Sequence, residues 1–290
     1  MYIYLNSDFV EADKAVVHIS DLAIQRGYGI FDFFRVMDNV PLFLEDYLDR
    51  FYASAATMRL DVALDREAFK STLFELIKRN NLPMSGIKVI LTGGYSPDGY
   101  QISKPNLIIQ QTALKFPPDT VQPEGIKVIT HEYVREIPNV KTINYITGIW
   151  TQKKMMEQGA ADVLYHMRGE VSEFPRCNFF VVKQDGTVAT PSQNILHGVT
   201  RKHVLELAKK KFTVKEEVVT VNDVYQAHEA FLTSTTKRII PIVQVDDTRI
   251  GDGKPGATTL TLLQDLIALE REERERSRLI KAYKKNCFLD

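Results

Sequence analysis

The chain has few of the features that mark secreted, metal-binding, nucleic-acid-binding or membrane proteins. Its two cysteines, Cys177 and Cys287, lie far apart in 290 residues, which predicts no disulfide framework and a reducing, cytoplasmic location. The six histidines are scattered, so no metal site is predicted. Lysine plus arginine and aspartate plus glutamate both total 37, and this balance argues against a nucleic-acid partner. No apolar run is long enough to cross a bilayer, and residues 1–7 do not resemble a signal peptide.

What the sequence does contain is a series of short apolar runs interspersed with helical patterns. This series predicts a mixed α/β fold of the α+β class. In the first part of the chain, strands are expected at 2–5, 16–19, 31–37, 87–92 and 107–111, with helices from residue 44 and over 67–79. Further on, strands are expected at 126–130, 161–166, 178–182, 230–233 and 239–245, with helices over 147–158 and 200–211 and a charged helix at the C-terminus.

One segment reads as a linker between two domains. Residues 116–125 contain three prolines and a glycine, which cannot continue a helix or a central strand. We therefore expect a smaller N-terminal α/β domain over 1–115. A larger, β-rich C-terminal domain is expected over 126–290, with a solvated charged helix at its end.

Two residues stand out by their setting. Lys141 lies in the motif VKTINY (140–145), after a proline-bearing turn and before a helical pattern. Glu173 opens the motif EFPRCNFF (173–180), at the start of an apolar strand. A lone lysine or glutamate is ordinarily a surface residue, so it is the combination of the two motifs that indicates chemistry.

Together the motifs resemble those of the class IV aminotransferases, the fold type IV enzymes that use pyridoxal phosphate (PLP). The resemblance extends from GYGIF (27–31) to GDG (251–253). It implies that Lys141 forms a Schiff base with the cofactor and acts as the catalytic base. It also implies that Glu173 keeps the pyridine nitrogen protonated and that Tyr145 hydrogen-bonds the phenolic oxygen of the cofactor.

The same resemblance implies where the phosphate of the cofactor binds. Val199 and Thr200 begin a predicted helix, whose N-terminal N–H groups favour an anion. Ser234 and Thr235 follow a predicted strand and offer hydroxyl and amide groups. Arg50, on a helix of the first domain, supplies a guanidinium group that suits a phosphate dianion.

The residues that would bind substrate depart from the common pattern of the family. Well-known D-amino acid aminotransferases hold the substrate carboxylate with a tyrosine and an Arg-x-His pair, but this chain has Phe31 and the sequence Asp98-Gly99-Tyr100 there. It resembles a less common group that uses arginines elsewhere, here Arg26 and Arg176. Phe31 and Tyr95 are expected to line the substrate site.

The resulting interpretation is a PLP-dependent aminotransferase that exchanges amino groups between D-amino acids, such as D-glutamate and D-alanine, and 2-oxo acids by a ping-pong mechanism. An L-branched-chain aminotransferase is the alternative, favoured by the aromatic side chains of Phe31, Phe33, Tyr95 and Tyr100. Aminodeoxychorismate lyase and an inactive PLP-carrying dimer are less favoured. The resemblance also implies a homodimer, with small-molecule substrates and neither a nucleic-acid nor a membrane partner.

Overall fold

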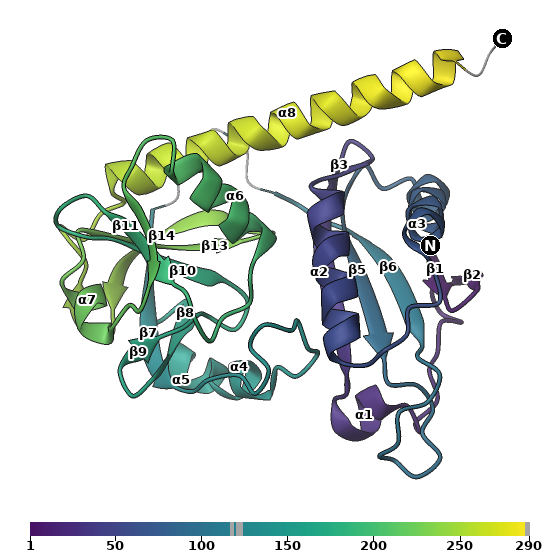
Figure 1. Ribbon diagram of the computed structural model, residues 1–290. Helices are drawn as coiled ribbons and strands as arrows, with labels where there is room; N and C mark the ends of the chain where they lie inside the picture. Colours follow the sequence, from purple (N-terminus) through teal and green to yellow (C-terminus); the bar gives the residue numbers. More distant parts are fainter. Residues whose placement is uncertain (117–118, 120–123, 288–290) are drawn as a thin grey trace. The chain divides into compact units, whose positions relative to one another are not determined.

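The computed structural model describes residues 1–116, 119 and 124–287 (Figure 1). The predicted linker falls largely on residues 117–118 and 120–123, which lie outside the described residues. The chain forms two compact units. Unit 1 comprises Met1–Phe116, Val140–Asn144 and Glu270–Asp290, and unit 2 comprises Pro117–Asn139 and Tyr145–Leu269.

This division differs from the predicted domain of residues 126–290 in two places. The segment Val140–Asn144, which carries Lys141, and the chain from Glu270 onward both belong to unit 1. The reason is long-range pairing that a local pattern does not reveal. The N–H of Phe31 donates to the carbonyl of Lys141 at 2.9 Å, and the N–H of Ile143 donates to the carbonyl of Gly29 at 3.1 Å.

Unit 1 contains a six-stranded antiparallel sheet in the order β2-β1-β6-β5-β3-β4 (Figure 1). Helix α2 packs on this sheet with a stripe of apolar residues at helical spacing, Leu44, Tyr47, Leu48, Phe51 and Ala55. The elements are β1 (Tyr2–Leu5), β2 (Asp8–Glu11), α1 (Leu22–Arg26), β3 (Gly29–Met37), β4 (Val40–Pro41), α2 (Leu44–Thr57), α3 (Arg66–Asn80), β5 (Met84–Thr92) and β6 (Leu107–Ala113).

The strand predicted over 16–19 is wrong, because these residues are irregular in the structure. The partner of β1 is instead β2, which pairs Tyr2 with Glu11 and Leu5 with Asp8. A tight turn at Asn6 and Ser7 joins the two strands, and Asn6 takes the left-handed conformation with φ 59°. Asparagine tolerates that conformation better than most residues, so the turn forms at residues 6 and 7. The second strand of the hairpin therefore comes earlier in the sequence than residue 16.

Unit 2 contains a nine-stranded mixed sheet in the order β12-β11-β10-β13-β14-β7-β8-β9, with β15 paired to β14. The predicted α+β class is confirmed. The elements are β7 (Ile126–Glu132), α4 (Ile146–Trp150), α5 (Gln152–Glu157), β8 (Asp162–Met167), β9 (Glu170–Val171), β10 (Asn178–Val182), β11 (Val188–Pro191), α6 (Val199–Ala208), β12 (Val214–Glu217), α7 (Val221–Tyr225), β13 (Glu229–Ser234), β14 (Arg238–Val245), β15 (Thr248–Arg249) and α8 (Ala257–Cys287).

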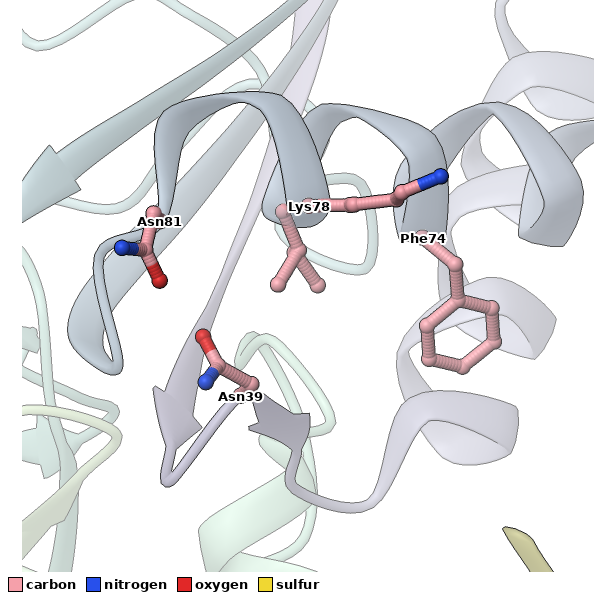
Figure 2. A pocket seen from close by; sticks show the side chains of 5 residues that line it. Asn39, Phe74, Lys78 and Asn81 are labelled. Atoms are coloured by element: carbon pink, nitrogen blue, oxygen red, sulfur yellow. The ribbon is translucent and has the colours of Figure 1, made fainter.

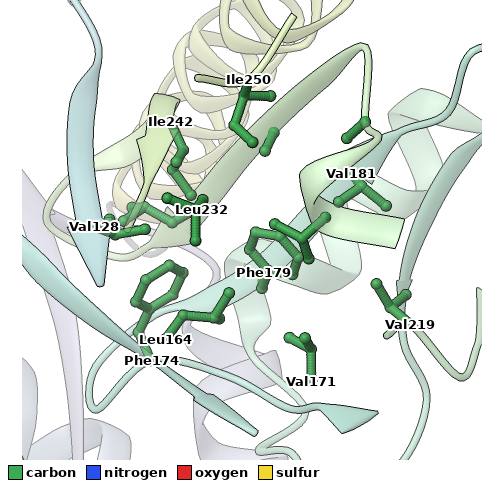
Figure 3. Packing of buried hydrophobic residues seen from close by; sticks show 14 of the residues in the cluster. Val128, Leu164, Val171, Phe174, Phe179, Val181, Val219, Leu232, Ile242 and Ile250 are labelled. Carbon is green, nitrogen blue, oxygen red and sulfur yellow. The ribbon is translucent and has the colours of Figure 1, made fainter. Parts of the chain in front are cut away.

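Both faces of the unit 2 sheet are buried, as the continuous apolar run of β10 requires. Phe179 and Val181 belong to one hydrophobic cluster, which Figure 3 shows. Phe180 and Val182 belong to a second cluster, which includes residues of α6 and α8. Because alternate residues of a strand point to opposite faces, β10 contributes side chains to two hydrophobic clusters, one on each face of the sheet.

Two helical predictions need correction. The helix expected over 147–158 is divided into α4 and α5 at Thr151, whose hydroxyl donates to the carbonyl of Thr147 at 2.9 Å. The N–H of Thr151 donates to the same carbonyl at 2.9 Å, and an additional hydroxyl bond of this kind bends a helix slightly. The charged stretch of α8 is also not uniformly solvated, since Glu270 is buried and forms an ion pair with Arg35. None of the helices in the described part of the chain is both long and apolar enough to span a membrane.

Candidate active site

The residues predicted to form the site are divided between the two units. Unit 1 carries the proposed catalytic lysine, one proposed phosphate ligand and three proposed substrate residues: Lys141, Arg50, Arg26, Phe31 and Tyr95. Unit 2 carries the remaining cofactor residues and the second proposed substrate arginine: Tyr145, Glu173, Val199, Thr200, Ser234, Thr235 and Arg176. The roles assigned to these residues stay predictions, and the geometry within each unit shows what each group is equipped to do.

In unit 1, Lys141 is fixed against the beginning of β3. An isolated bridge between Ile30 and Thr142 and the bond from the Phe31 N–H to the Lys141 carbonyl attach its backbone to this strand. Its Nζ lies 4.6 Å from the centroid of the Phe31 ring. The lysine is half-buried. Lys141 therefore has a fixed backbone and an amino group placed over an aromatic face.

In unit 2, Glu173 stands at the base of a tight turn. An antiparallel bridge joins Glu173 to Asn178, and the N–H of Phe174 donates to the carbonyl of Cys177 at 2.9 Å. Glu173 is buried, with 4% of the residue exposed. Its Oε2 accepts bonds from the N–H of Leu196 at 3.0 Å and from Nδ2 of Asn178 at 3.3 Å. A buried carboxylate oriented in this way suits an interaction with a protonated ring nitrogen.

Arg135 is the residue at this site that sequence reasoning missed. Its Nε and Nη2 donate to Oε1 of Glu173 at 2.9 and 2.7 Å, and Nη2 also donates to the carbonyl of Pro138. An adjacent cation favours the charged form of a carboxyl group. No sequence signal separates Arg135 from the other 36 basic residues, because its partner lies 38 positions further along the chain.

The start of α6 is built for a close approach by an anion. Its N-cap is Gly198, and no side chain caps the helix there. A Cβ at Gly198 would meet Oδ1 of Asn178 at 2.1 Å, so only glycine fits. Nδ2 of Asn178 also donates to the carbonyl of Leu196 at 2.7 Å. Asn178 thus links the loop before α6 to Glu173, and the first turn, with Val199 and Thr200, presents its N–H groups to an anion.

The second phosphate segment lies beside the Glu173 turn in the sheet. Strand β13 ends at Ser234 and pairs with β10, with Thr233 opposite Asn178. Ser234 Oγ accepts a bond from the N–H of Lys237 at 3.2 Å. Burial raises the pKa of the neighbouring Cys177 thiol to about 11, so this thiol is neutral at physiological pH. The unit 2 residues are therefore a donor set that fits PLP, with hydroxyl and amide groups for the phosphate and a carboxylate for the ring nitrogen.

Arg50 has a partner that the sequence interpretation did not include. Its Nε and Nη2 donate to the two carboxylate oxygens of Asp32 at 2.9 and 2.6 Å. Asp32 is almost completely buried. This two-point contact holds the guanidinium plane in one orientation. The role of Arg50 in phosphate binding stays a prediction, and Asp32 is the group that would aim it.

The substrate arginines are both exposed. Arg26 ends α1, and one of its Nη atoms lies 3.7 Å from the place that a Cβ of Gly99 would take. Arg176 lies within the Glu173–Asn178 turn, at the surface of unit 2. Across residues 1–116, 119 and 124–287, no carboxylate lies within ion-pair distance of Arg26 or Arg176. A salt bridge from Arg176 to Glu170, the structural alternative to substrate binding, is therefore absent from the described residues.

The carboxylate of Asp98 is occupied by hydrogen bonds within its own loop. Its Oδ1 accepts bonds from the N–H groups of Tyr100 and Gln101 at 2.9 and 2.8 Å and from the hydroxyl of Ser96 at 3.1 Å. The two backbone bonds lower the pKa of this carboxyl group. Asp98 thus shapes its own loop, which also carries the partly exposed Tyr95.

Unit 1 also has a surface pocket, which is lined by other residues than those predicted to form the site. Its lining comes from the turn after β3 and from the end of α3: Asn39, Phe74, Ile77, Lys78 and Asn81 (Figure 2). No residue predicted to bind cofactor or substrate is among them. This pocket therefore adds nothing to the proposed active site.

The fold and the donor set together define a PLP enzyme of fold type IV, and sequence comparison agrees. The model of the family described as amino-transferase class IV matches residues 29–245. The chain belongs to the class IV aminotransferases. PLP is the cofactor of this family, as the sequence interpretation predicted.

Individual relatives carry different substrate names. The chain is 30% identical over 279 residues to a D-alanine aminotransferase of Bacillus licheniformis, covering 93% of this chain and 98% of the relative. It is 32% identical over 275 residues to a putative branched-chain-amino-acid aminotransferase of Methanocaldococcus jannaschii, covering 90% and 94%. The structure of the branched-chain amino acid aminotransferase of Escherichia coli aligns with a TM-score of 0.85 at 25% identity, covering 93% and 94%. These names leave the substrate to be argued from the residues.

Proposed function

We propose that this aminotransferase transfers amino groups between D-amino acids and 2-oxo acids, with D-glutamate and D-alanine as amino donors. The observation that carries the proposal is the state of Arg26 and Arg176. Both guanidinium groups are exposed, and neither has a carboxylate partner in the described part of the chain. Arg26 Nη1 donates to the carbonyl of Gln25 at 2.8 Å, and an arginine that has no carboxylate partner of its own is suited to a planar, two-point contact with a substrate carboxylate. Two such residues suit a dicarboxylic substrate.

The residues around the cofactor divide the chemical work. Bound PLP supplies an aldehyde that bonds to the substrate nitrogen and a ring that accepts the electron pair from Cα. Lys141 would act as the general base that takes the proton from Cα of the amino acid and as the acid that gives it back. Glu173, oriented by Arg135 and Asn178, holds a proton at the ring nitrogen. The first turn of α6 and the end of β13 hold the phosphate, and Tyr145 donates to the phenolic oxygen.

An L-branched-chain aminotransferase is the second candidate. Phe31, Phe33 and Tyr95 are half-buried or exposed aromatic residues of unit 1 and suit an apolar substrate side chain. The relatives from Methanocaldococcus jannaschii and Escherichia coli carry that name. Under this reading Arg176 has no role in binding a substrate carboxylate. For either activity we expect a cytoplasmic homodimer.

A half-reaction tests the proposal directly. The purified PLP enzyme is mixed separately with D-alanine, D-glutamate, L-leucine and L-glutamate, and conversion of the cofactor to its pyridoxamine form is followed by absorbance. We expect the D-amino acids to convert the cofactor of the wild-type enzyme. In the control variant K141A, we expect no amino acid to convert it. Conversion by L-leucine alone would assign the protein to the branched-chain group. Release of pyruvate from aminodeoxychorismate without a 2-oxo acid acceptor would assign it to the lyases.

A further inference from the structure

Asp21 is a completely buried carboxylate, 0% exposed, that the proposed mechanism does not use. It is the N-cap of α1, and its Oδ1 accepts a bond from the N–H of Ala23 at 2.8 Å. Its Oδ2 accepts bonds from the hydroxyl of Thr92 and from Nδ2 of Asn106, both at 2.7 Å. One side chain therefore joins three segments that are far apart in the sequence.

These three segments surround the predicted carboxylate site of unit 1. Thr92 ends β5 and Asn106 precedes β6, so the two residues mark the ends of the loop 93–105, which contains Tyr95 and Gly99. The N–H of Leu22 also donates to the carbonyl of Gly94 at 3.0 Å, and an isolated bridge links Asp21 to Tyr95. Asp21 thus fixes both ends of the loop to the first turn of α1.

Helix α1 depends on this attachment because it is short. It has five residues, Leu22–Arg26, and a helix of that length has little stability of its own. Arg26 is its last residue and lies beside Gly99 of the loop. A hydrogen bond to a charged group is about twice as strong as a neutral one, so the carboxylate of Asp21 is well suited to hold the helix against the loop. A rotation of α1 at its first turn would displace the guanidinium group at its end.

We propose that Asp21 is a positioning residue for substrate recognition, which sets the place of Arg26 relative to the loop 93–105. The inference rests on the proposed function, since it takes Arg26 as a ligand of the substrate carboxylate. Asp21 itself touches neither substrate nor cofactor in this proposal. Its effect is on the affinity for the amino acid, and the proton transfers at Lys141 are independent of it.

The test replaces Asp21 by serine, which keeps the cap of α1 and removes the oxygen that serves Thr92 and Asn106. KM and kcat are measured with the best amino donor found in the half-reaction. We expect D21S to raise KM about tenfold, the size of losing bonds to a charged group, with kcat nearly unchanged. The matched control is D65S, the same change at the N-cap of α3, where Asp65 accepts a bond from the N–H of Ala68 at 2.8 Å. D65S should leave KM unchanged.

A double-mutant cycle separates positioning from a general structural effect. If Asp21 acts through Arg26, D21S should raise KM in the wild-type background but not in an R26A background. An equal effect in both backgrounds, or a fall in kcat at unchanged KM, would overturn the proposal. Should D21S not fold, T92V removes the hydroxyl that donates to Asp21 and accepts a bond from the N–H of Gly94 at 3.2 Å, and it should raise KM about threefold. An unchanged KM in T92V would overturn the proposal as well.

Failure of the proposed function gives a different result. If only an L-amino acid is converted, the D-amino acid assignment fails, and the cycle is then measured with that donor. If R26A leaves KM unchanged with every donor, Arg26 does not bind the substrate carboxylate. The inference about Asp21 is then wrong, but the aminotransferase activity is not contradicted.

Discussion

At the scale of single residues, the ion pair between Arg135 and Glu173 fixes the carboxylate that we propose to face the ring nitrogen of the cofactor. Both side chains are largely buried, with 15% and 6% of their side-chain surface exposed. Glu173 receives two bonds from Arg135 and one each from Leu196 and Asn178. A carboxylate so well supplied with donors keeps its orientation.

We expect R135Q to lower kcat by about 10- to 100-fold while the amino-acid KM changes little. Glutamine keeps one donor but removes the positive charge, which raises the proton affinity of the carboxylate. The proton then shifts from the ring nitrogen to Glu173, and only the transition state depends strongly on the protonated ring. Steady-state kinetics of R135Q and R135K check this. R135K, which restores the charge without the two-point geometry, should recover part of kcat. Equal losses in the two variants would contradict the role of charge.

At the scale of secondary-structure elements, α8 is attached to β3 by ion pairs within unit 1. Arg35 on β3 pairs with Glu270, with 5% and 3% of their side-chain surface exposed. At the turn after β3, Asp38 pairs with Arg274 at 3.1 Å and with Arg278 at 2.8 Å. The exposed pairs add little to the free energy of unfolding. Removing one member of the buried pair should lower that free energy strongly, because it leaves a buried charge without its partner.

E270Q should lower the free energy of unfolding by about 3–5 kcal/mol, because it leaves the buried guanidinium of Arg35 without its counter-charge. Urea denaturation measures the change. The control E272Q alters an exposed glutamate of the same helix and should change stability by less than about 0.5 kcal/mol. Replacing both members, as R35M/E270L, should recover most of the loss. A double variant no more stable than E270Q would show that the charge pair is not the cause.

The elements also show which predictions from sequence succeed. Helices α2, α3 and α6 and strands β3, β5 and β10 lie where apolar periodicity placed them, because burial on one or both faces determines that periodicity. The strand at 16–19 failed because the left-handed turn at Asn6 closes a hairpin earlier. The helix at 147–158 was divided by Thr151, whose hydroxyl bond to the backbone no periodicity reveals.

At the scale of the whole molecule, the membership of the units rests on contacts that are distant in sequence. The motifs of Lys141 and Glu173 were recognisable because each joins a particular residue type to a fixed local sequence, which a family resemblance can match. Arg135, Asp32 and Asp21 were not recognisable, because each acts through partners 18 to 85 positions away. Local sequence patterns indicate secondary structure and catalytic motifs. They say little about which charged side chains form ion pairs with each other.

Cofactor binding should stabilise the whole chain by mass action. At about 100 times its Kd, PLP adds about 2.7 kcal/mol to the free energy of unfolding, which raises the Tm by several degrees. Thermal unfolding of the apoenzyme with increasing PLP checks this. K141A retains the proposed ring and phosphate contacts but lacks the covalent bond, so its shift should be smaller at each concentration. The absence of any shift in the wild-type protein would contradict PLP binding.

The contact between Gly198 and Asn178 has a consequence for altering this enzyme. Because a Cβ at position 198 would displace Asn178, and Asn178 also orients Glu173, a change at one end of the cofactor site propagates to the other. We therefore expect substitutions at positions 173, 178 and 198 to have coupled effects. Libraries that seek a new substrate range would best leave these three positions intact and randomise positions 26, 31, 95 and 176, whose side chains are exposed or half-buried.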